Sequence, residues 1–248
     1  MAKDKTSLTG TVTGAKGSVT ARSSVDEIDA FLEKAREMTP AAADRAPGQG
    51  RLVFALDATM SRQPTWDRAC ALQGEMFREA ARIGGLDVQL VYFRGFNECR
   101  ASRWVGDARA LAGLMTKIDC RGGHTQIGKV LTHALSETKK ARVNALVYVG
   151  DCMEERVDDL AQKAGELGML GVPVFLFQDG GDMIAERAFR EIARLSKGAY
   201  CRLDAGSAHR LGELLRAVAA YAAGGRKALL ALSEAGGGEA RLLLEQMR

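Results

Sequence analysis

Three oxygen-bearing side chains follow a short apolar run at alternate positions, and together they could bind a hard metal ion. The run covers residues 52–56, and Asp57, Thr59 and Ser61 follow it. An apolar run of this length with polar boundaries is typical of a buried strand. Ligands of open parallel sheets bind just beyond the carboxyl ends of such strands. A carboxylate and two hydroxyls at that place suit Mg²⁺ or Mn²⁺.

Two later segments carry further oxygen ligands. A glycine pair at 122–123 forms a turn that delivers Thr125 before a helical stretch, and a second buried-strand run at 145–149 leads to Asp151. In the common doubly wound sheet, the first and fourth strands are neighbours at the point where the winding reverses. We therefore expect Asp57 and Asp151 to meet in one crevice. Packing alone does not explain such a meeting, because a buried carboxylate without a partner is costly.

This arrangement resembles the von Willebrand factor A (vWA) domain family over roughly residues 51–224. The metal-ion-dependent adhesion site (MIDAS) of that family combines an Asp-x-Ser-x-Ser loop, a Thr after a glycine pair and an Asp that ends a strand. The resemblance implies five metal ligands, which are Asp57, Thr59, Ser61, Thr125 and Asp151. Cys152 departs from the pattern, because it stands where the family often has Gly. The resemblance also implies protein binding and not catalysis, with a carboxylate of the partner completing the shell of the ion.

Strand and helix patterns alternate along the chain from residue 51. The candidate strands are 52–56, 88–93, 101–105, 145–149, 172–177 and 200–203. The candidate helices are 66–83, 108–118, 127–141, 156–167, 183–196 and 207–223. This alternation predicts an α/β protein with a doubly wound, mostly parallel sheet of six strands and helices on both faces. The resemblance implies its Rossmann-like vWA form, with 101–105 as a short antiparallel edge strand.

The segments outside the vWA domain at 51–224 have other compositions. Residues 1–23 are rich in Thr, Ser, Gly and Lys and are predicted to be disordered. Residues 24–50 are predicted to form a capped helix followed by a linker. Residues 225–248 are predicted to form a helical appendage. Its leucine-rich helix at 239–247 either docks on the domain or binds a partner.

The composition is that of an intracellular globular protein. Apolar residues make up 46% and charged residues 27% of the chain, and the net charge is +4. The basic excess is spread along the chain, which argues against nucleic-acid binding. No apolar stretch approaches a membrane span, and the first residues lack the apolar core of a signal peptide. The five cysteines form an odd count without close pairing, which indicates reduced thiols and not a disulfide framework. We therefore expect a cytoplasmic protein of a bacterial type that contacts neither nucleic acid nor membrane.

The main alternative is a haloacid-dehalogenase-like, magnesium-dependent phosphatase with Asp57 as its nucleophile. Asp151 with Glu154 or Glu155 would then be its metal motif. That family has a general acid/base at the position of Thr59, and a hydroxyl cannot shuttle a proton as a carboxyl does. The sequence therefore favours a protein that binds a partner and is not an enzyme.

Three residues near the predicted crevice are candidates for contact with a protein partner. They are His124, Trp104 and Cys152. His124 precedes Thr125 in the glycine-containing turn, and a free cysteine such as Cys152 is most often a small buried apolar residue. An aromatic side chain at a crevice is a useful anchor for a partner, which applies to Trp104. Phe96 is expected in the core.

Overall fold

The computed structural model describes residues 50–62, 86–107, 110, 113–114, 117–203 and 208–247. The strands are β1 (Gly50–Asp57), β2 (Leu86–Arg94), β3 (Glu98–Ala101), β4 (Ala145–Gly150), β5 (Val174–Asp179) and β6 (Ala199–Leu203). The helices are η1 (Met60–Arg62, a 3-10 helix), α4 (Ile127–Lys140), α5 (Val157–Met169), α6 (Met183–Ser196), α7 (Ala208–Glu234) and α8 (Gly238–Gln246). The predicted segments at 1–23 and 66–83, all of 24–50 except its last residue, and most of 108–118 lie outside the described residues.

The six strands form one sheet in the order β3-β2-β1-β4-β5-β6. β1 pairs in parallel with β2 and β4, β5 and β6 continue the parallel part, and β3 is antiparallel at the edge. This topology confirms the predicted α/β fold class. β1 and β4 are buried along their whole length, as expected for parallel strands with helices on both faces. The winding reverses between β1 and β4, where a ligand site is expected at the carboxyl ends of the strands.

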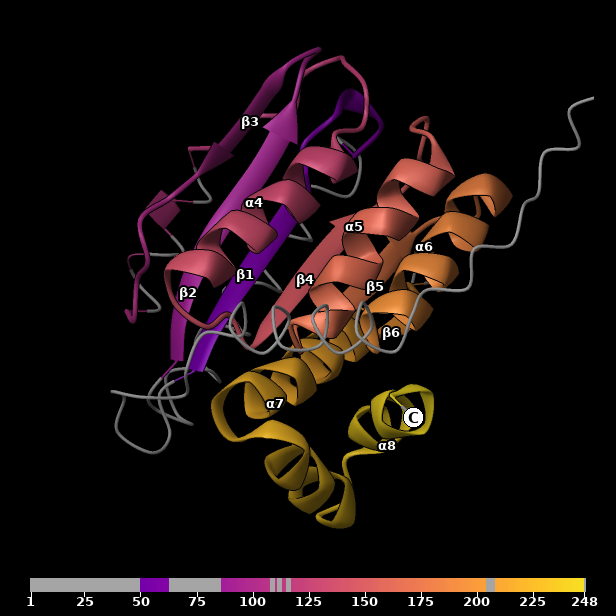
Figure 1. Cartoon of the computed structure of the whole chain (residues 1–248). Helices are drawn as coiled ribbons and strands as arrows, with labels where there is room; N and C mark the ends of the chain where they lie inside the picture. The colour runs from indigo at the N-terminus through magenta and orange to yellow at the C-terminus, as the bar shows by residue number, and fades with distance from the viewer. Residues whose placement is uncertain are drawn as a thin grey trace, which may run out of the picture.

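Alternate side chains of β1 divide between two apolar cores. Leu52, Phe54 and Leu56 belong to the core that includes α7, and Val53 and Ala55 belong to the core that includes α4, α5 and α6. Figure 1 shows α4, α5 and α6 side by side over one face of the sheet, with α7 on the opposite side. Packing on both faces fixes the ends of the central strands, and so it fixes the residues that follow them.

The edge strand lies earlier in the chain than predicted. β3 covers Glu98–Ala101, and Val105 makes only an isolated antiparallel bridge to Val88. Gly95 has a left-handed φ of 62°, which turns the chain so that β3 pairs with the end of β2. The predicted range of 101–105 was wrong because pairing with β2, and not an apolar run, determines where this strand begins.

The C-terminal part of the chain folds back on the domain. α7 continues beyond the predicted end at 223 and bends at Gly225, which has a φ of 65°. α8 packs against α7, where Leu243 is 0% exposed, and Gln246 Oε1 accepts a hydrogen bond from the backbone N–H of Tyr200 at 2.9 Å. Of the two predicted roles of this helix, the structure supports docking. Neither α7 nor any other described helix is long and apolar enough to cross a membrane.

Candidate metal centre

The end of β1 places three oxygen side chains in one hydrogen-bonded loop. Asp57 is the last residue of β1 and is 0% exposed. Its Oδ1 accepts a hydrogen bond from the backbone N–H of Thr59 at 2.8 Å. The hydroxyls of Thr59 and Ser61 lie 3.0 Å apart, and either can donate to the other. The structure therefore brings these three predicted ligands together.

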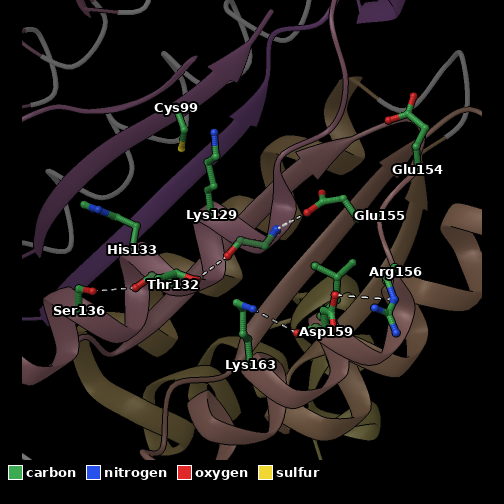
Figure 2. A pocket seen from close by; sticks show the side chains of 12 residues that line it. Cys99, Lys129, Thr132, His133, Ser136, Glu154, Glu155, Arg156, Asp159 and Lys163 are labelled. Carbon is green, nitrogen blue, oxygen red and sulfur yellow. Dashed lines mark hydrogen bonds and ion pairs between the residues drawn. The ribbon is translucent and has the colours of Figure 1, made fainter. Parts of the chain in front are cut away.

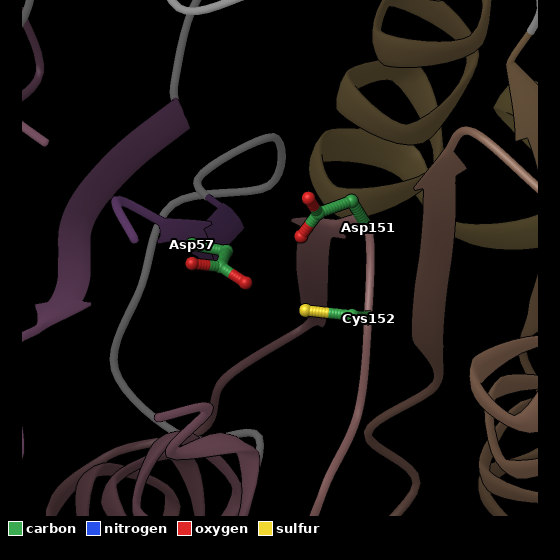
Figure 3. Close-up of side chains that lie close together, drawn as sticks. All are labelled: Asp57, Asp151 and Cys152. Carbon is green, nitrogen blue, oxygen red and sulfur yellow. The ribbon is translucent and has the colours of Figure 1, made fainter. Parts of the chain in front are cut away.

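The end of β4 delivers a second carboxylate and a thiol to the same place. Asp151 and Cys152 follow Gly150, the last residue of β4. A carboxylate oxygen of Asp57, a carboxylate oxygen of Asp151 and the Sγ of Cys152 all lie within 4.8 Å of one another. Figure 3 shows the three side chains converging from the ends of the two strands. The two aspartates thus meet where the order of the strands places them, and Cys152 joins them.

Three buried polar atoms at this point have no hydrogen-bond partner within the described part of the chain. They are Asp57 Oδ2, Asp151 Oδ1 and the hydroxyl of Tyr148. The Tyr148 hydroxyl lies directly behind Gly150, where a Cβ would be 2.4 Å from it. Buried polar atoms without partners are rare in folded proteins, and a bound ion or water is a common explanation. Two unpaired carboxylate oxygens with a hydroxyl donor behind them fit a hydrated cation, so the residues present are suited to a metal ion.

Burial also changes the acidity of the groups in this cluster. It raises the pKa of Asp57 from 3.8 to about 7, and the nearby charge of Asp151 adds to the rise. Hydrogen bonds from Thr59 and the positive charge of Arg62 act in the opposite direction. Burial, followed by the charge of Asp151, raises the pKa of the Cys152 thiol to about 12. A cation between these groups would oppose both effects, because it favours the negatively charged forms.

A buried arginine joins the β1 loop to the end of β5. Arg62 is the last residue of η1, and its Nη1 forms an ion pair with Asp179 Oδ2. Asp179 ends β5, so the pair connects two strand ends on either side of β4. Arg62 could not be predicted from the sequence, because an arginine after a polar loop looks like a surface residue until its partner on β5 is known.

Two glutamates in the β4–α5 loop hold the segment that carries Thr125. Glu154 Oε2 accepts hydrogen bonds from both the backbone N–H and the hydroxyl of Thr125 at 2.9 Å, and the backbone N–H of Glu154 donates back to that hydroxyl at 3.2 Å. Glu155 accepts from the backbone N–H groups of Ile127 and Gly128 at the start of α4. The hydroxyl of Thr125 keeps a second lone pair, which can serve a metal ion. Neither glutamate was recognised as a support of the site.

Backbone contacts hold the loop before Thr125 beside the other loops of the crevice. The N–H of Arg121 donates to the carbonyl oxygen of Ala58 at 3.0 Å. Gly123 lies so close to the β2–β3 turn that a Cβ would be 2.0 Å from the carbonyl oxygen of Gly95. Only glycine allows this approach. The loops that carry the predicted ligands therefore lie together, although they are far apart in the sequence.

Two aromatic rings lie on the rim of this region. His124 is exposed, and its ring packs edge-on against Phe96 with a centroid distance of 5.2 Å. Phe96 is 77% exposed, so the prediction that it lies in the core was wrong. It sits in the turn between β2 and β3, outside both apolar cores of the described part of the chain. Met60, between Thr59 and Ser61, is also largely exposed.

Trp104 lies far from these residues. Its indole Nε1 donates a hydrogen bond to Glu137 Oε2 at 2.7 Å, and the guanidinium of Arg51 lies 3.7 Å from its ring centroid. Arg51 is near the start of β1, six residues before Asp57, which is about 20 Å along a strand. The expectation that Trp104 lies near Asp57 was wrong. β3 runs antiparallel to β2, so the chain that follows it reaches the opposite end of the sheet, where Val105 bridges to Val88.

A groove of about 760 Å³ lies along α4 and α5 (Figure 2). Its lining includes Cys99, Lys129, Thr132, His133, Ser136, Glu154, Glu155, Arg156, Asp159 and Lys163. Several of its charged groups contact one another or the backbone. Arg156 pairs with Asp159 at 3.9 Å, and Lys163 donates to the carbonyl oxygen of Asp159 at 3.5 Å. The two carboxylate oxygens without partners in the described part of the chain lie instead at the ends of β1 and β4, which makes that cluster the stronger candidate site.

Solved structures of other proteins share this arrangement of strands and helices. A von Willebrand factor type A protein from Catenulispora acidiphila superposes with a TM-score of 0.58 and 18% identity, over 71% of this chain and 43% of its own. The vWA domain of SpRpn10 superposes with a TM-score of 0.55 and 12% identity, over 66% of this chain and 94% of its own. This chain has a vWA fold. An aerotolerance-related membrane protein from Bacteroides fragilis is similar as well, with a TM-score of 0.52 and 17% identity over 65% of this chain and 94% of its own.

The similarity to vWA domains is found by comparing structures and not by comparing sequences. No protein-family model matches the sequence, and a search of curated proteins found no match. The chain spans less than half of the Catenulispora protein. The vWA fold is thus established by the topology of the sheet and its helices.

Proposed function

We propose that this protein is a divalent-cation-dependent protein-binding domain that works inside the cell and is not an enzyme. The ion, Mg²⁺ or Mn²⁺, is held by five residues of the crevice between β1 and β4, namely Asp57, Thr59, Ser61, Thr125 and Asp151. A carboxylate of the partner completes the coordination shell, so the ion bridges the two proteins. The adhesion or scaffold role that the vWA resemblance implies belongs to this proposal.

The pair of unpartnered carboxylate oxygens carries the proposal. Within the described part of the chain, neither Asp57 Oδ2 nor the neighbouring Asp151 Oδ1 has a hydrogen-bond donor, and both atoms are buried. Two negative groups so close together repel each other and are poorly solvated, and a cation relieves both penalties. The hydroxyls of Thr59 and Ser61, 3.0 Å apart, offer further oxygen ligands next to Asp57. Oxygen ligands of this kind are those that Mg²⁺ and Mn²⁺ prefer.

The rim of the crevice supports contact with another protein. Phe96 and Met60 are largely exposed, and His124 is exposed beside Phe96. Exposed apolar side chains around a charged centre supply the buried area that one metal–carboxylate bond lacks. A partner with an acidic residue flanked by apolar side chains therefore fits this surface.

The contacts of the site do not favour the phosphatase alternative. Its metal motif needs Glu154 or Glu155, but both side chains bind the segment from Thr125 to Gly128. Its general acid is missing, because Thr59 stands at that position. Among the described residues, the remaining groups of the cluster suit a cation better than acid/base turnover.

The first experiment measures binding of the ion alone. Calorimetry and thermal unfolding with Mg²⁺ or Mn²⁺ should show binding and a raised melting temperature, because an ion that binds only the folded state stabilises it. Ser61→Ala should weaken the binding, and Ser136→Ala on the exposed face of α4 is a matched control. Equal melting in chelator and in either ion, with no heat of binding, would contradict the proposal.

The second experiment tests the carboxylate bridge. A random peptide library is panned on the immobilised protein with Mn²⁺ and eluted with chelator. Eluted peptides should share an Asp or Glu whose change to Asn or Gln abolishes capture. Asp57→Ala, verified as folded by circular dichroism, should lose the same peptides. Capture that resists chelator, or that Asp57→Ala retains, would exclude the bridge.

A further inference from the structure

Cys152 differs in its surroundings from an ordinary buried cysteine. A free cysteine usually packs as a small apolar side chain. The Sγ of Cys152 instead lies within 4.8 Å of a carboxylate oxygen of Asp57 and of Asp151. Each of these carboxylates also has a buried oxygen without a hydrogen-bond partner in the described part of the chain, and Asp57 is wholly buried. The thiol hydrogen-bonds to Asp151, but Asp57 Oδ2 and Asp151 Oδ1 still lack partners in the described part of the chain. A cation that the thiol also ligates would satisfy both oxygens.

Sulfur and oxygen ligands prefer different ions. Mg²⁺ takes oxygen ligands in near-octahedral geometry and keeps several waters. A thiolate favours softer ions, of which Zn²⁺ is the usual one in proteins, and Zn²⁺ accepts carboxylates as well. A catalytic or binding zinc site commonly has three protein ligands and one open position. Asp57, Asp151 and Cys152 provide that number and that mixture.

The dimensions of the cluster agree with this type of ion. Bonds from Zn²⁺ to oxygen and sulfur are about 2.0–2.3 Å long, so neighbouring ligands of a tetrahedral ion lie about 3.3–3.8 Å apart. The three donor atoms already lie within 4.8 Å of one another. Closing the remaining difference needs side-chain movements of about 1 Å, which rotation about the side-chain bonds of Cys152 and Asp151 can supply. No strand has to move.

We propose that Cys152 makes this centre a mixed carboxylate–thiolate site that selects Zn²⁺-class ions over Mg²⁺. The inference rests on the proposed function and changes the identity of its ion, since an ion of the Zn²⁺ class would bridge to the partner in place of Mg²⁺ or Mn²⁺. The two aspartates determine that a cation binds, and Cys152 determines which cation is preferred. The thiol loses its proton to water when the ion binds. The fourth position stays open for water or for the carboxylate of the partner.

Co²⁺ is the probe for this proposal, because a bond between Co²⁺ and a thiolate gives a near-ultraviolet charge-transfer band that oxygen ligands do not give. Addition of Co²⁺ to the full chain should produce the band at equimolar metal. Zn²⁺ should remove it, and a roughly hundredfold excess of Mg²⁺ should not. Cys152→Ser should abolish the band and weaken Zn²⁺ binding by roughly tenfold or more, with Mg²⁺ binding unchanged.

Cys99→Ser is the matched control, because Cys99 is also a half-buried cysteine but lies on β3 outside the cluster. It should keep the band and the affinity for Zn²⁺. Two results would overturn the inference and leave the oxygen-ligated site intact. One is binding of Co²⁺ without the band. The other is a Cys152→Ser protein that prefers Zn²⁺ over Mg²⁺ as strongly as the wild type does. If the wild type binds none of the three ions, the inference and the proposed function fail together.

Discussion

The substitution Asp57→Asn should stabilise the ion-free protein at alkaline pH, although it removes a proposed metal ligand. Asp57 is wholly buried, and burial is the main reason that its pKa rises from 3.8 to about 7. Asn keeps an oxygen that can accept the hydrogen bond from the Thr59 backbone N–H. Its amide N–H can also donate to the unpartnered oxygen of Asp151. The variant therefore removes a buried charge and leaves the local bonding in place.

The pKa values determine the direction and the size of the effect. Below pH 3.8 the carboxyl group is protonated in both the folded and the unfolded chain, so its pKa shift has no effect on stability. Between 3.8 and about 7 only the unfolded chain releases the proton, so stability falls as the pH rises. At about 1.4 kcal/mol for each pH unit, the full loss above pH 7 is roughly 4 kcal/mol. Asn has no such loss, so its advantage over Asp should grow by about 3 kcal/mol between pH 5 and pH 8.

Urea denaturation in chelator at pH 5 and pH 8 measures this advantage for the wild type and for Asp57→Asn. An ion at roughly 100 times its dissociation constant should narrow the difference at pH 8, because only the wild type then gains about 2.7 kcal/mol, which is less than the roughly 4 kcal/mol lost to the buried charge. An advantage that does not grow with pH, or a variant less stable than the wild type at pH 8 in chelator, would refute the reasoning about the buried charge.

Two further substitutions test the supports of the fold and of the site. Leu243→Ala in α8 should lower the free energy of unfolding by about 2–5 kcal/mol, because Leu243 is 0% exposed. The control Leu230→Ala, at a position that is 49% exposed, should lower it much less. Equal effects of the two substitutions in calorimetry would show that α8 is not docked. Gly123→Ala should weaken ion binding and stability, because its Cβ would be 2.0 Å from the Gly95 carbonyl oxygen. Gly122→Ala meets nothing within 4 Å and is its control, so similar binding isotherms for the two variants would contradict the close approach.

The strands whose side chains face two cores could be predicted from the sequence, and the strand that depends on pairing could not. β1 and β4 are buried over their whole length, and the apolar runs at 52–56 and 145–149 lie within them because helices cover both sides of the sheet. β3 contains Glu98, Cys99 and Arg100, and only its pairing with β2 identifies it as a strand. The glycine pair before Arg226 predicted the end of a helix, but α7 bends at Gly225 and continues, because Leu229 is buried in the core beyond the bend.

The candidate site shows the same division between local and tertiary information. Asp57 and Asp151 each end an apolar run, so their types and positions were visible in the sequence. Glu154 and Glu155 look like solvated residues before a helix, and their role depends on where α4 begins in space. Phe96 was misplaced because an aromatic residue between two strands looks like part of the core. The proximity of the Cys152 thiol to both carboxylates follows from the packing of β1 against β4, which no local pattern contains.

The hydrogen bond between Gln246 and Tyr200 also bears on how the protein avoids aggregation. β6 is the outermost strand on its side of the sheet. Such a strand presents unpaired N–H and C=O groups to which another chain can add a strand of its own. The Gln246 side chain already takes the N–H of Tyr200, and α8 lies against β6. A chain without α8 would leave the N–H of Tyr200 open to a strand from another copy, so removal of the C-terminal helix should favour strand addition at β6.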